Sequence, residues 1–277
     1  MQASAAEPDR YAIVGHPVGH SWSPFIHGMF SKQTGHAVNY RMLDLTPERF
    51  RIGAIEFFTT GGKGLNVTVP HKQAAAELVN ELSPTADRAQ AVNTISMRGN
   101  ELIGDNTDGT GLIRDLTENL GFIVGGKTVL ILGAGGATRG ILQPLLASAP
   151  AAVLVANRTQ TRGEALIRTF GDLGAIRAVG LESVPDTPFD LIVNATSASL
   201  SGETLSIPKE TVSSATLCYD MSYGKGETPF TSWAKGAGAG QAVKGWGMLV
   251  EQAAESFHIW RGVRPDTRPV LQALTRL

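Results

Sequence analysis

Short apolar runs alternate with amphipathic segments along the chain, most clearly between residues 129 and 156. Residues 129–132 are an apolar run of the length and composition typical of a buried parallel strand. A helical pattern with apolar positions on one face follows to residue 149, and residues 152–156 form a second buried strand. The first strand and the helix are joined by Gly133-Ala134-Gly135-Gly136-Ala137. Strand, glycine turn, helix and strand in this order are typical of a dinucleotide-binding unit.

The glycine turn predicts where a phosphate would lie. Small residues at Gly133 and Gly135 allow a tight turn and let a pyrophosphate approach the N–H groups at the helix start. Thr138 occupies the position of the usual third glycine, and Pro144 inside the helix predicts a lost backbone hydrogen bond and a kink. A glycine turn that binds no nucleotide is the alternative.

The residues after the second strand bear on the choice of nucleotide. An NAD site usually has Asp or Glu there, which accepts from the ribose 2′-hydroxyl. This chain instead has Asn157, Arg158 and Thr159, followed by Arg162. The missing acid and the two guanidiniums favour NADP, since Arg can clamp a 2′-phosphate. The alternative is that both arginines are ordinary surface charges.

The rest of the chain continues the alternation, which predicts an α/β fold. At 277 residues the chain is expected to form about two domains, and the helices at 109–120 and 248–260 are expected to cross between them. The glycine-rich run 234–247 resembles a linker or mobile loop. Strands are also expected at 91–95 and 102–106, which would form a hairpin. The other expected strands are 11–15, 39–43, 64–69, 175–179, 190–194 and 217–221. The other expected helices begin near 25 and span 47–60, 73–82, 160–171 and 270–277.

Charge and composition exclude several classes of protein. With 24 basic and 25 acidic side chains, the chain gives no indication of binding nucleic acid or an anionic membrane. The single cysteine, Cys218, excludes an internal disulfide and a cysteine zinc site, and its strand context makes it a core residue. His16 and His20 flank Pro17 and Gly19, so they predict a turn and no metal site. Without a signal peptide or an apolar span, a cytoplasmic protein is expected.

Several polar residues lie beside expected strand ends or helix starts. Ser23 before Pro24 has the pattern of an N-cap with proline at N1, and the alternative is that its hydroxyl helps to hold a carboxylate. Lys72 begins a helix, where its charge is unfavourable with the macrodipole, which indicates either a function or an exposed lysine. Asn93 and Asp108 lie beside strand ends, where ligands of α/β proteins gather, but such residues also serve in turns and caps.

Together these segments resemble the shikimate dehydrogenase family from residue 11 to about 257. The matching motifs, in chain order, are SWSP at 21–24, GLNVTVPHK at 64–72, AVNT at 91–94, GDNTDG at 104–109, GAGGA at 133–137, NRT at 157–159, NATS at 194–197, YDM at 219–221 and GWGMLVEQA at 245–253. Each motif is weak alone, and nine in the same order are specific. Trp22 departs from the smaller or basic residue common between the two serines, which leaves fine specificity open.

The resemblance implies an N-terminal α/β substrate domain and a Rossmann-type NADP-binding domain. Residues 1–108 with 247–277 would bind substrate and carry the catalytic groups, and residues 109–246 would bind NADP. Lys72 would be the acid/base, paired with Asp108. The implied substrate residues are Ser21, Ser23, Asn66, Thr68, Lys72, Asn93, Asp108, Tyr223 and Gln252. The implied cofactor residues are Gly133, Ala134, Gly135, Gly136, Ala137, Asn157, Arg158, Thr159, Arg162, Thr196, Met221, Gly245 and Met248.

The activity implied by the resemblance is reversible hydride transfer between NADPH and 3-dehydroshikimate in aromatic amino-acid biosynthesis, by a monomer or homodimer without a metal. The protein would align the nicotinamide with the ketone carbon. Two alternatives stay open: a quinate/shikimate dehydrogenase with relaxed substrate or cofactor use, and a non-catalytic sensor of shikimate or NADP. The presence of Lys72 and Asp108, with no appended segment, favours the enzyme.

Overall fold

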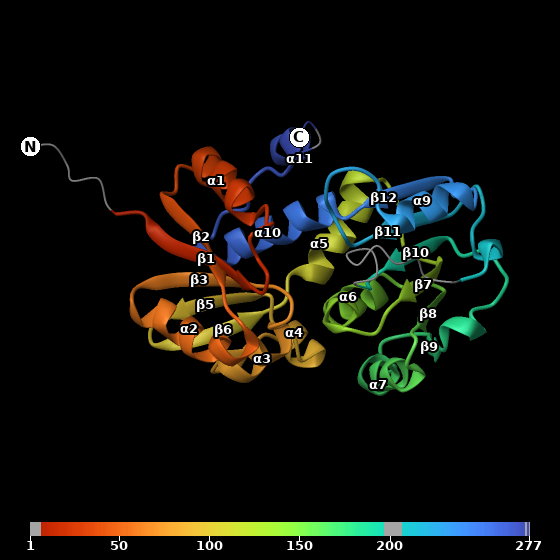
Figure 1. Ribbon diagram of the computed structural model, residues 1–277, viewed down its shortest axis with the longest axis horizontal. Helices are drawn as coiled ribbons and strands as arrows, with labels where there is room; N and C mark the ends of the chain where they lie inside the picture. Colours follow the sequence, from red (N-terminus) through yellow and green to blue (C-terminus); the bar gives the residue numbers. More distant parts are fainter. Residues whose placement is uncertain (1–6, 197–206, 275, 277) are drawn as a thin grey trace, which may run out of the picture. The chain divides into compact units, whose positions relative to one another are not determined.

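The computed structural model describes residues 7–196, 207–274 and 276 (Figure 1). The chain divides into two compact units, the first made of Met1–Thr107 and Val250–Arg276 and the second of Asp108–Leu249. Helix α10 (Trp246–Arg261) therefore begins in the second unit and continues in the first. The predicted α/β fold is confirmed. The assignment of substrate to 1–108 with 247–277, and of cofactor to 109–246, stays a prediction.

A mixed six-stranded sheet, in the order β2-β1-β3-β5-β6-β4, forms the centre of the first unit. Strand β1 pairs in parallel with β2 and β3, and β5 runs antiparallel to β3 and β6. The predicted hairpin is confirmed by β5 and β6, with Gly99 at φ 63° in the turn. The strands are β1 (Asp9–Gly15), β2 (Val38–Asp44), β3 (Gly62–Val67), β4 (Glu81–Leu82), β5 (Thr94–Arg98) and β6 (Glu101–Asp105).

The two faces of this sheet pack against different helices, since alternate residues of a strand point to opposite sides (Figure 1). On one face, Val14 and Leu65 join a core with Phe50 and Ala54 of α2. On the other face, an added Cβ on Gly64 would lie 2.4 Å from the ring of Trp260 in α10, so only glycine lets this helix approach so closely. The helices of this unit are α1 (Ser23–Thr34), α2 (Pro47–Thr59), α3 (Lys72–Leu78), α4 (Pro84–Ala89), the later part of α10, and α11 (Arg268–Leu274).

The helix predicted over 73–82 is too long. Helix α3 ends at Leu78 because Val79 is extended, with φ −76° and ψ 158°, and the Asn80 side chain accepts from Leu102 N–H at 2.8 Å. A second helix, α4, then begins at Pro84 with the Ser83 hydroxyl as its N-cap. The Ser83-Pro84 pair is a helix-start signal of the kind recognised at Ser23-Pro24.

The second unit is built on a parallel six-stranded sheet in the order β12-β11-β10-β7-β8-β9. The strand order reverses on either side of β7, which is the doubly wound arrangement of dinucleotide-binding folds. Ligands of such sheets bind beyond the carboxyl ends of the strands at this reversal. The strands are β7 (Thr128–Leu132), β8 (Ala152–Ala156), β9 (Ile176–Val179), β10 (Leu191–Asn194), β11 (Leu217–Asp220) and β12 (Gln241–Lys244).

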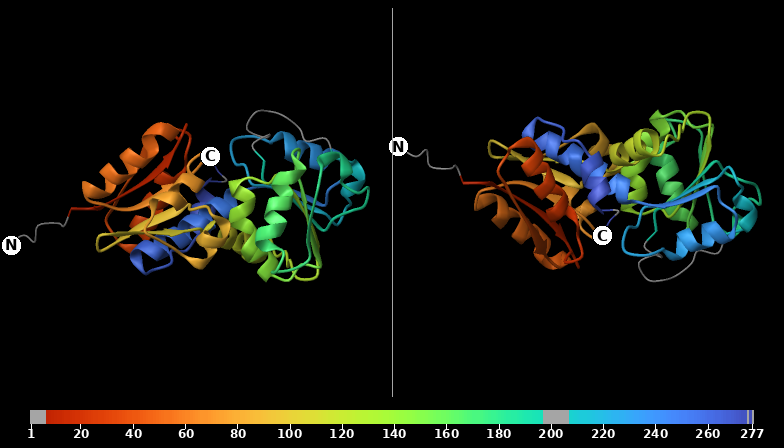
Figure 2. Two further views of the ribbon diagram at one scale, coloured as in Figure 1. Left: turned by 90° about the horizontal axis from the view of Figure 1, so that it is seen from below. Right: turned by 90° about the horizontal axis from the view of Figure 1, so that it is seen from above.

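Helices cover both faces of the parallel sheet, with α6 and α7 in green on one face and α9 in blue on the other (Figure 2). Alternation along β7 explains this, because Val129 and Ile131 pack with Leu142 and Leu166, whereas Leu130 and Leu132 pack toward Phe230. Cys218 belongs to the second of these cores and is fully buried, as predicted. The helices are α5 (Asp108–Arg114), a π-helical turn (Asp115–Asn119), α6 (Gly136–Ala147), α7 (Gln160–Phe170) and α9 (Pro229–Gly236), with short 3₁₀ turns at Leu181–Ser183 and Lys209–Thr211.

The prediction of a linker or mobile loop over 234–247 is wrong. This stretch contains the end of α9, the edge strand β12 and the start of α10. Its glycines allow close backbone contacts at both ends of β12. An added Cβ on Gly240 would lie 2.2 Å from the carbonyl oxygen of Ser214, and one on Gly245 would lie 2.6 Å from that of Met221.

Candidate active site

The glycine turn between β7 and α6 leaves the start of the helix open. Gly133 has φ 104°, and an added Cβ there would lie 2.9 Å from the methyl carbon of Thr196. Gly135 is the N-cap of α6 and offers no side-chain cap, and an added Cβ on Gly135 or Gly136 would have no neighbour within 4 Å. The start of α6 therefore has no side-chain cap and has room beside Gly135 and Gly136 among the described residues, which fits a phosphate group.

Thr138 compensates for the missing third glycine. Its buried hydroxyl donates to the Gly133 carbonyl oxygen at 2.9 Å, which fixes the turn from within the helix. Ala134 and Ala137 are half-buried and complete the turn. Helix α6 continues through Pro144 to Ala147. The hydrogen bond from Thr138 thus stabilises the tight turn between β7 and α6 although the third glycine is missing.

The residues after β8 carry exposed positive charge. Asn157 donates from its side-chain amide to the carbonyl oxygen of Thr159 at 2.8 Å, which closes the turn into α7. Arg158 and Arg162 are exposed at the two ends of this turn. Within the described residues, no carboxylate pairs with either guanidinium, and no acidic residue lies between β8 and the first turn of α7. This arrangement fits an anionic 2′-phosphate.

Buried polar groups organise the carboxyl ends of β10 and β11. Asn194 accepts from the Thr196 hydroxyl at 2.7 Å and donates to the Asp220 carboxylate at 3.1 Å. That carboxylate also accepts from Ser222 N–H at 3.0 Å. Thr196 and the half-buried Met221 therefore follow strand ends whose backbone is fixed from inside.

The start of α10 is held by a second buried group. The Tyr219 hydroxyl donates to Asp115 at 2.6 Å and accepts from Met248 N–H at 3.3 Å. Gly245 N–H donates to the Ser222 carbonyl oxygen at 3.0 Å. These bonds hold Gly245 and Met248, two predicted cofactor residues, beside the ends of β11 and β12.

Tyr223 is the predicted substrate residue that lies well inside the second unit. It follows β11, and its ring packs against Trp246 with the centroids 5.3 Å apart. Burial raises the pKa of its phenol, so the hydroxyl stays protonated at neutral pH and can donate a hydrogen bond. The other predicted substrate residues lie in the first unit, except Asp108, which is the first residue of the second.

Ser21 and Ser23 lie together at the start of α1. Their hydroxyl oxygens are 3.2 Å apart, and Ser21 also accepts from Ser23 N–H at 3.2 Å. The prediction that Ser23 is the N-cap is wrong, because the helix begins at Ser23 and Trp22 occupies the N-cap position without a side-chain cap. Ser21, one residue further out, takes the hydrogen bond instead. Two hydroxyls beside a helix start suit a carboxylate.

Thr68 and Lys72 lie on the segment that leads from β3 into α3. The carbonyl oxygen of Thr68 accepts from His71 N–H at 2.9 Å, and Lys72 is the first residue of α3, as predicted. The backbone carbonyl of Lys72 accepts from Val92 N–H at 2.8 Å, which places Lys72 beside the strand segment that carries Asn93. Asp108 is buried and directly follows Thr107 in the chain.

Asn66, Asn93 and Gln252 form one polar cluster in the first unit. Asn66 donates from its amide to the Asn93 carbonyl oxygen at 3.3 Å. The Asn93 side chain accepts from Thr107 N–H at 2.9 Å and donates to Gln252 at 3.4 Å. Asn66 and Asn93 are 5 % and 2 % exposed, so this cluster is largely assembled without a ligand.

Four residues of this cluster were not predicted. Tyr40, Thr94, Thr107 and Ser256 make hydrogen bonds to Asn66 or Asn93 or to each other. Thr94 and Thr107 lie inside the quoted AVNT and GDNTDG motifs. Ser256 is four residues after Gln252, a spacing that puts both on one helix face. Tyr40 lies in β2, and no local pattern marks it.

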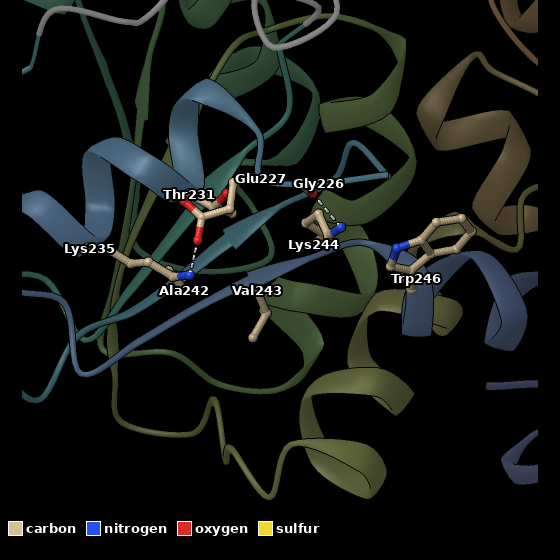
Figure 3. A pocket seen from close by; sticks show the side chains of 8 residues that line it. All are labelled: Gly226, Glu227, Thr231, Lys235, Ala242, Val243, Lys244 and Trp246. Carbon is tan, nitrogen blue, oxygen red and sulfur yellow. Dashed lines mark hydrogen bonds and ion pairs between the residues drawn. The ribbon is translucent and has the colours of Figure 1, made fainter. Parts of the chain in front are cut away.

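A separate pocket of about 440 Å³ lies between α9 and β12 in the second unit (Figure 3). Lys235 pairs with Glu227 on one side, and Lys244 donates to the Gly226 carbonyl oxygen at 2.6 Å. None of the predicted substrate or cofactor residues lines this pocket, so it is not part of the candidate active site. Over the residues that the structure describes, no group of three potential metal ligands is found, and no helix is long and apolar enough to cross a membrane.

The doubly wound sheet, the open glycine turn and the polar cluster define a two-unit α/β protein of the dinucleotide-binding class. Three family models match it: the shikimate dehydrogenase substrate binding domain at 13–95, shikimate/quinate 5-dehydrogenase at 116–219 and the shikimate 5′-dehydrogenase C-terminal domain at 245–275. A shikimate dehydrogenase (NADP(+)) of Alkalilimnicola ehrlichii is 52 % identical over 96 % of this chain and 98 % of its own. One of Methylococcus capsulatus is 50 % identical over 97 % and 96 %. The chain belongs to the shikimate dehydrogenase family.

Solved structures are similar over the same length. An Ael1 enzyme from Pseudomonas putida is 41 % identical, with a TM-score of 0.90 over 96 % of this chain and 98 % of its own. The shikimate dehydrogenase of Thermus thermophilus, solved with NADP(H) and shikimate, is 34 % identical, with a TM-score of 0.86 over 97 % and 99 %. The fold is therefore shared along nearly the whole chain.

Proposed function

We propose that this chain catalyses the reversible, NADP-dependent reduction of 3-dehydroshikimate to shikimate. The observation that carries the proposal is the 52 % identity over 96 % of the chain to an NADP-dependent shikimate dehydrogenase. The start of α6, which has no side-chain cap, and the exposed Arg158 and Arg162, with which no carboxylate among the described residues pairs, support a phosphorylated dinucleotide. A cytoplasmic monomer or homodimer belongs to the same proposal.

The polar residues of the first unit have chemistry that suits the substrate. Shikimate carries a carboxylate and several hydroxyls, which need many hydroxyl and amide partners. The hydroxyls of Ser21 and Ser23 at the start of α1 would bind the carboxylate. The hydroxyl-binding groups would be Asn66, Thr68, Asn93 and Gln252, with Tyr223 donating from the second unit.

Lys72 and Asp108 would move the proton. Bound NADPH would supply the hydride to the ketone carbon. As the carbonyl oxygen gains negative charge, the Lys72 ammonium would donate a proton to it, and in the reverse direction the Lys72 amine would accept that proton. The Asp108 carboxylate would orient Lys72 toward this oxygen. The protein also aligns the reacting carbon and hydride donor, which lowers the barrier by removing the entropy cost of their encounter.

An activity assay tests the proposal directly. NADPH oxidation should require 3-dehydroshikimate and proceed better than NADH oxidation, and shikimate should be oxidised better than quinate in reverse. Comparable rates with quinate or NADH would instead indicate a relaxed quinate/shikimate dehydrogenase. Tight binding of NADP and shikimate without turnover would identify a sensor.

The proton-transfer role predicts a specific defect in one variant. Lys72→Ala should lower kcat by about 10² to 10⁴, the usual contribution of general acid–base catalysis, with little change in KM for shikimate. Lys63→Ala, at an exposed lysine of β3, is the matched control and should keep wild-type kcat. Asp108→Asn should also lower kcat, and the double variant should lose less than the product of the two effects. Wild-type kcat in Lys72→Ala would contradict the role.

A further inference from the structure

The hydroxyl of Ser256 lies at the centre of the polar cluster in the first unit. It is on α10, one turn after Gln252, and is 0 % exposed. Its oxygen accepts from the Asn66 amide at 3.0 Å, lies 2.7 Å from the Thr94 hydroxyl and 3.3 Å from that of Thr107. It donates to the Gln252 carbonyl oxygen at 3.0 Å. One hydroxyl therefore connects β3, β5, the segment after β6 and α10.

The contacts of Asn66 determine which side of its side-chain amide is the nitrogen and which is the oxygen. The amide nitrogen faces the Asn93 carbonyl oxygen at 3.3 Å, and a carbonyl can only accept. The same nitrogen donates to Ser256, while the Tyr40 hydroxyl donates to the amide oxygen at 2.6 Å. The Thr94 hydroxyl lies 3.3 Å from the same nitrogen, so both amide hydrogens have acceptors inside the unit. The oxygen is the atom of Asn66 that has accepting capacity for a ligand hydroxyl.

Tyr40 and Ser256 bond to different ends of the Asn66 amide, and each is itself held in place. Tyr40 is itself held by His27, whose ring stacks on it with centroids 4.3 Å apart and an interplanar angle of 8°. His27 is fully buried, and burial lowers its pKa to about 3, so the stacked ring is neutral. Ser256 is held by the regular backbone of α10. Neither Tyr40 nor Ser256 needs to touch the ligand to affect how Asn66 meets it.

We propose that Ser256 is a positioning residue for substrate recognition, which holds the Asn66 amide so that its oxygen accepts from a substrate hydroxyl. The inference rests on the proposed function, because it requires Asn66 to contact shikimate. Loss of this hydroxyl removes the acceptor nearest to the Asn66 amide nitrogen and leaves the 3.3 Å contacts to the Asn93 carbonyl oxygen and the Thr94 hydroxyl, so the amide is held less firmly.

Binding of shikimate to the Ser256→Ala enzyme, measured by calorimetry without cofactor, tests the proposal. The dissociation constant for shikimate should rise about tenfold, the effect of one lost hydrogen bond, while that for NADP stays unchanged. Ser31→Ala is the matched control, because the Ser31 hydroxyl also bonds within the first unit, to the His36 carbonyl oxygen at 2.6 Å, but outside the cluster. This variant should bind shikimate as the wild type does.

A double-mutant cycle separates positioning from a general loss of packing. In an Asn66→Ala background, Ser256→Ala should change shikimate affinity by less than about twofold, because Ser256 acts through Asn66. Full, additive losses in the cycle, or wild-type affinity in Ser256→Ala, would overturn the proposal. If Ser256→Ala does not fold, Tyr40→Phe removes the other group that fixes Asn66, and wild-type shikimate affinity in that variant overturns the proposal equally. A wild-type enzyme that binds no shikimate would instead refute the proposed function.

Discussion

Two arginines near the end of β8, Arg158 and Arg162, bear on the choice between NADP and NAD. Arg158 and Arg162 are exposed on either side of the turn into α7, and the Asn157 amide holds that turn closed. An acid here would bind a ribose hydroxyl and repel a 2′-phosphate, whereas Arg binds the phosphate with charge-assisted hydrogen bonds. The preference between two cofactors that differ by one phosphate group therefore depends on a few side chains.

Arg158→Ala should raise KM for NADP about 10- to 100-fold, since a hydrogen bond to a charged group contributes about 1.5–3 kcal/mol. The KM for NAD should change little, because NAD lacks the phosphate. Initial rates with both cofactors give the comparison. Arg168→Ala, at an exposed arginine in the last turn of α7, should leave both values unchanged. Equal losses with NADP and NAD would show that Arg158 does not bind the 2′-phosphate.

At the scale of helices and strands, regular alternation was enough to predict most elements. The run 129–132, the glycine turn and the following helix were predicted correctly because burial on both faces of a parallel strand leaves an apolar sequence. The stretch 234–247 was not, because its glycines look the same in sequence whether they permit motion or close contact. Gly240 and Gly245 are there because backbone oxygens lie against them, and those oxygens belong to distant segments.

The residues of the candidate site likewise fall into those that local sequence predicts and those that it does not. The proposed substrate and cofactor residues lie in motifs and could be named from the sequence, whereas Tyr40 and Ser256 bond to Asn66, which is remote from both along the chain. The hydrogen bond from Asn66 to Ser256 joins residues 190 positions apart, so no local pattern records it. Ser23 illustrates a smaller failure, since the hydrogen bond at the helix start depends on Ser21 and not on the local proline signal.

The π-helical turn after α5 packs so closely against Gly247 of α10 that a larger residue there is expected to destabilise the protein. An added Cβ on Gly247 would lie 1.7 Å from a carboxylate oxygen of Asp115, which is buried and bonded to Tyr219. Gly247→Ala should therefore destabilise the second unit by about 1–3 kcal/mol, the usual cost of overpacking. Gly236→Ala is the control, since an added Cβ in that turn of α9 meets nothing within 4 Å. Denaturant unfolding measures both, and equal stability of the two variants would contradict this account.

For the molecule as a whole, the single cysteine allows the stability of the second unit to be measured separately, because Cys218 lies in that unit. Cys218 lies in β11, is 0 % exposed, and burial raises its pKa to about 12, so its thiol cannot react while the sheet is intact. Saturation with NADP at about 100 times Kd should slow thiol labelling about a hundredfold, because ligand binding stabilises the folded unit by about 2.7 kcal/mol. A labelling rate that NADP does not change would place the nucleotide outside this unit.

The interrupted layout of the first unit affects the order in which a newly synthesised chain matures. The second unit is essentially one continuous stretch, Asp108–Leu249, whereas the first includes Val250–Arg276, which is synthesised after that stretch. Domains fold as units as soon as their segments are present. The dinucleotide fold can therefore form before Gln252 and Ser256 have been made. Until Trp260 has been made, the face of the first sheet at Gly64 lacks the helix that packs against it, and uncovered sheet surface of this kind favours aggregation.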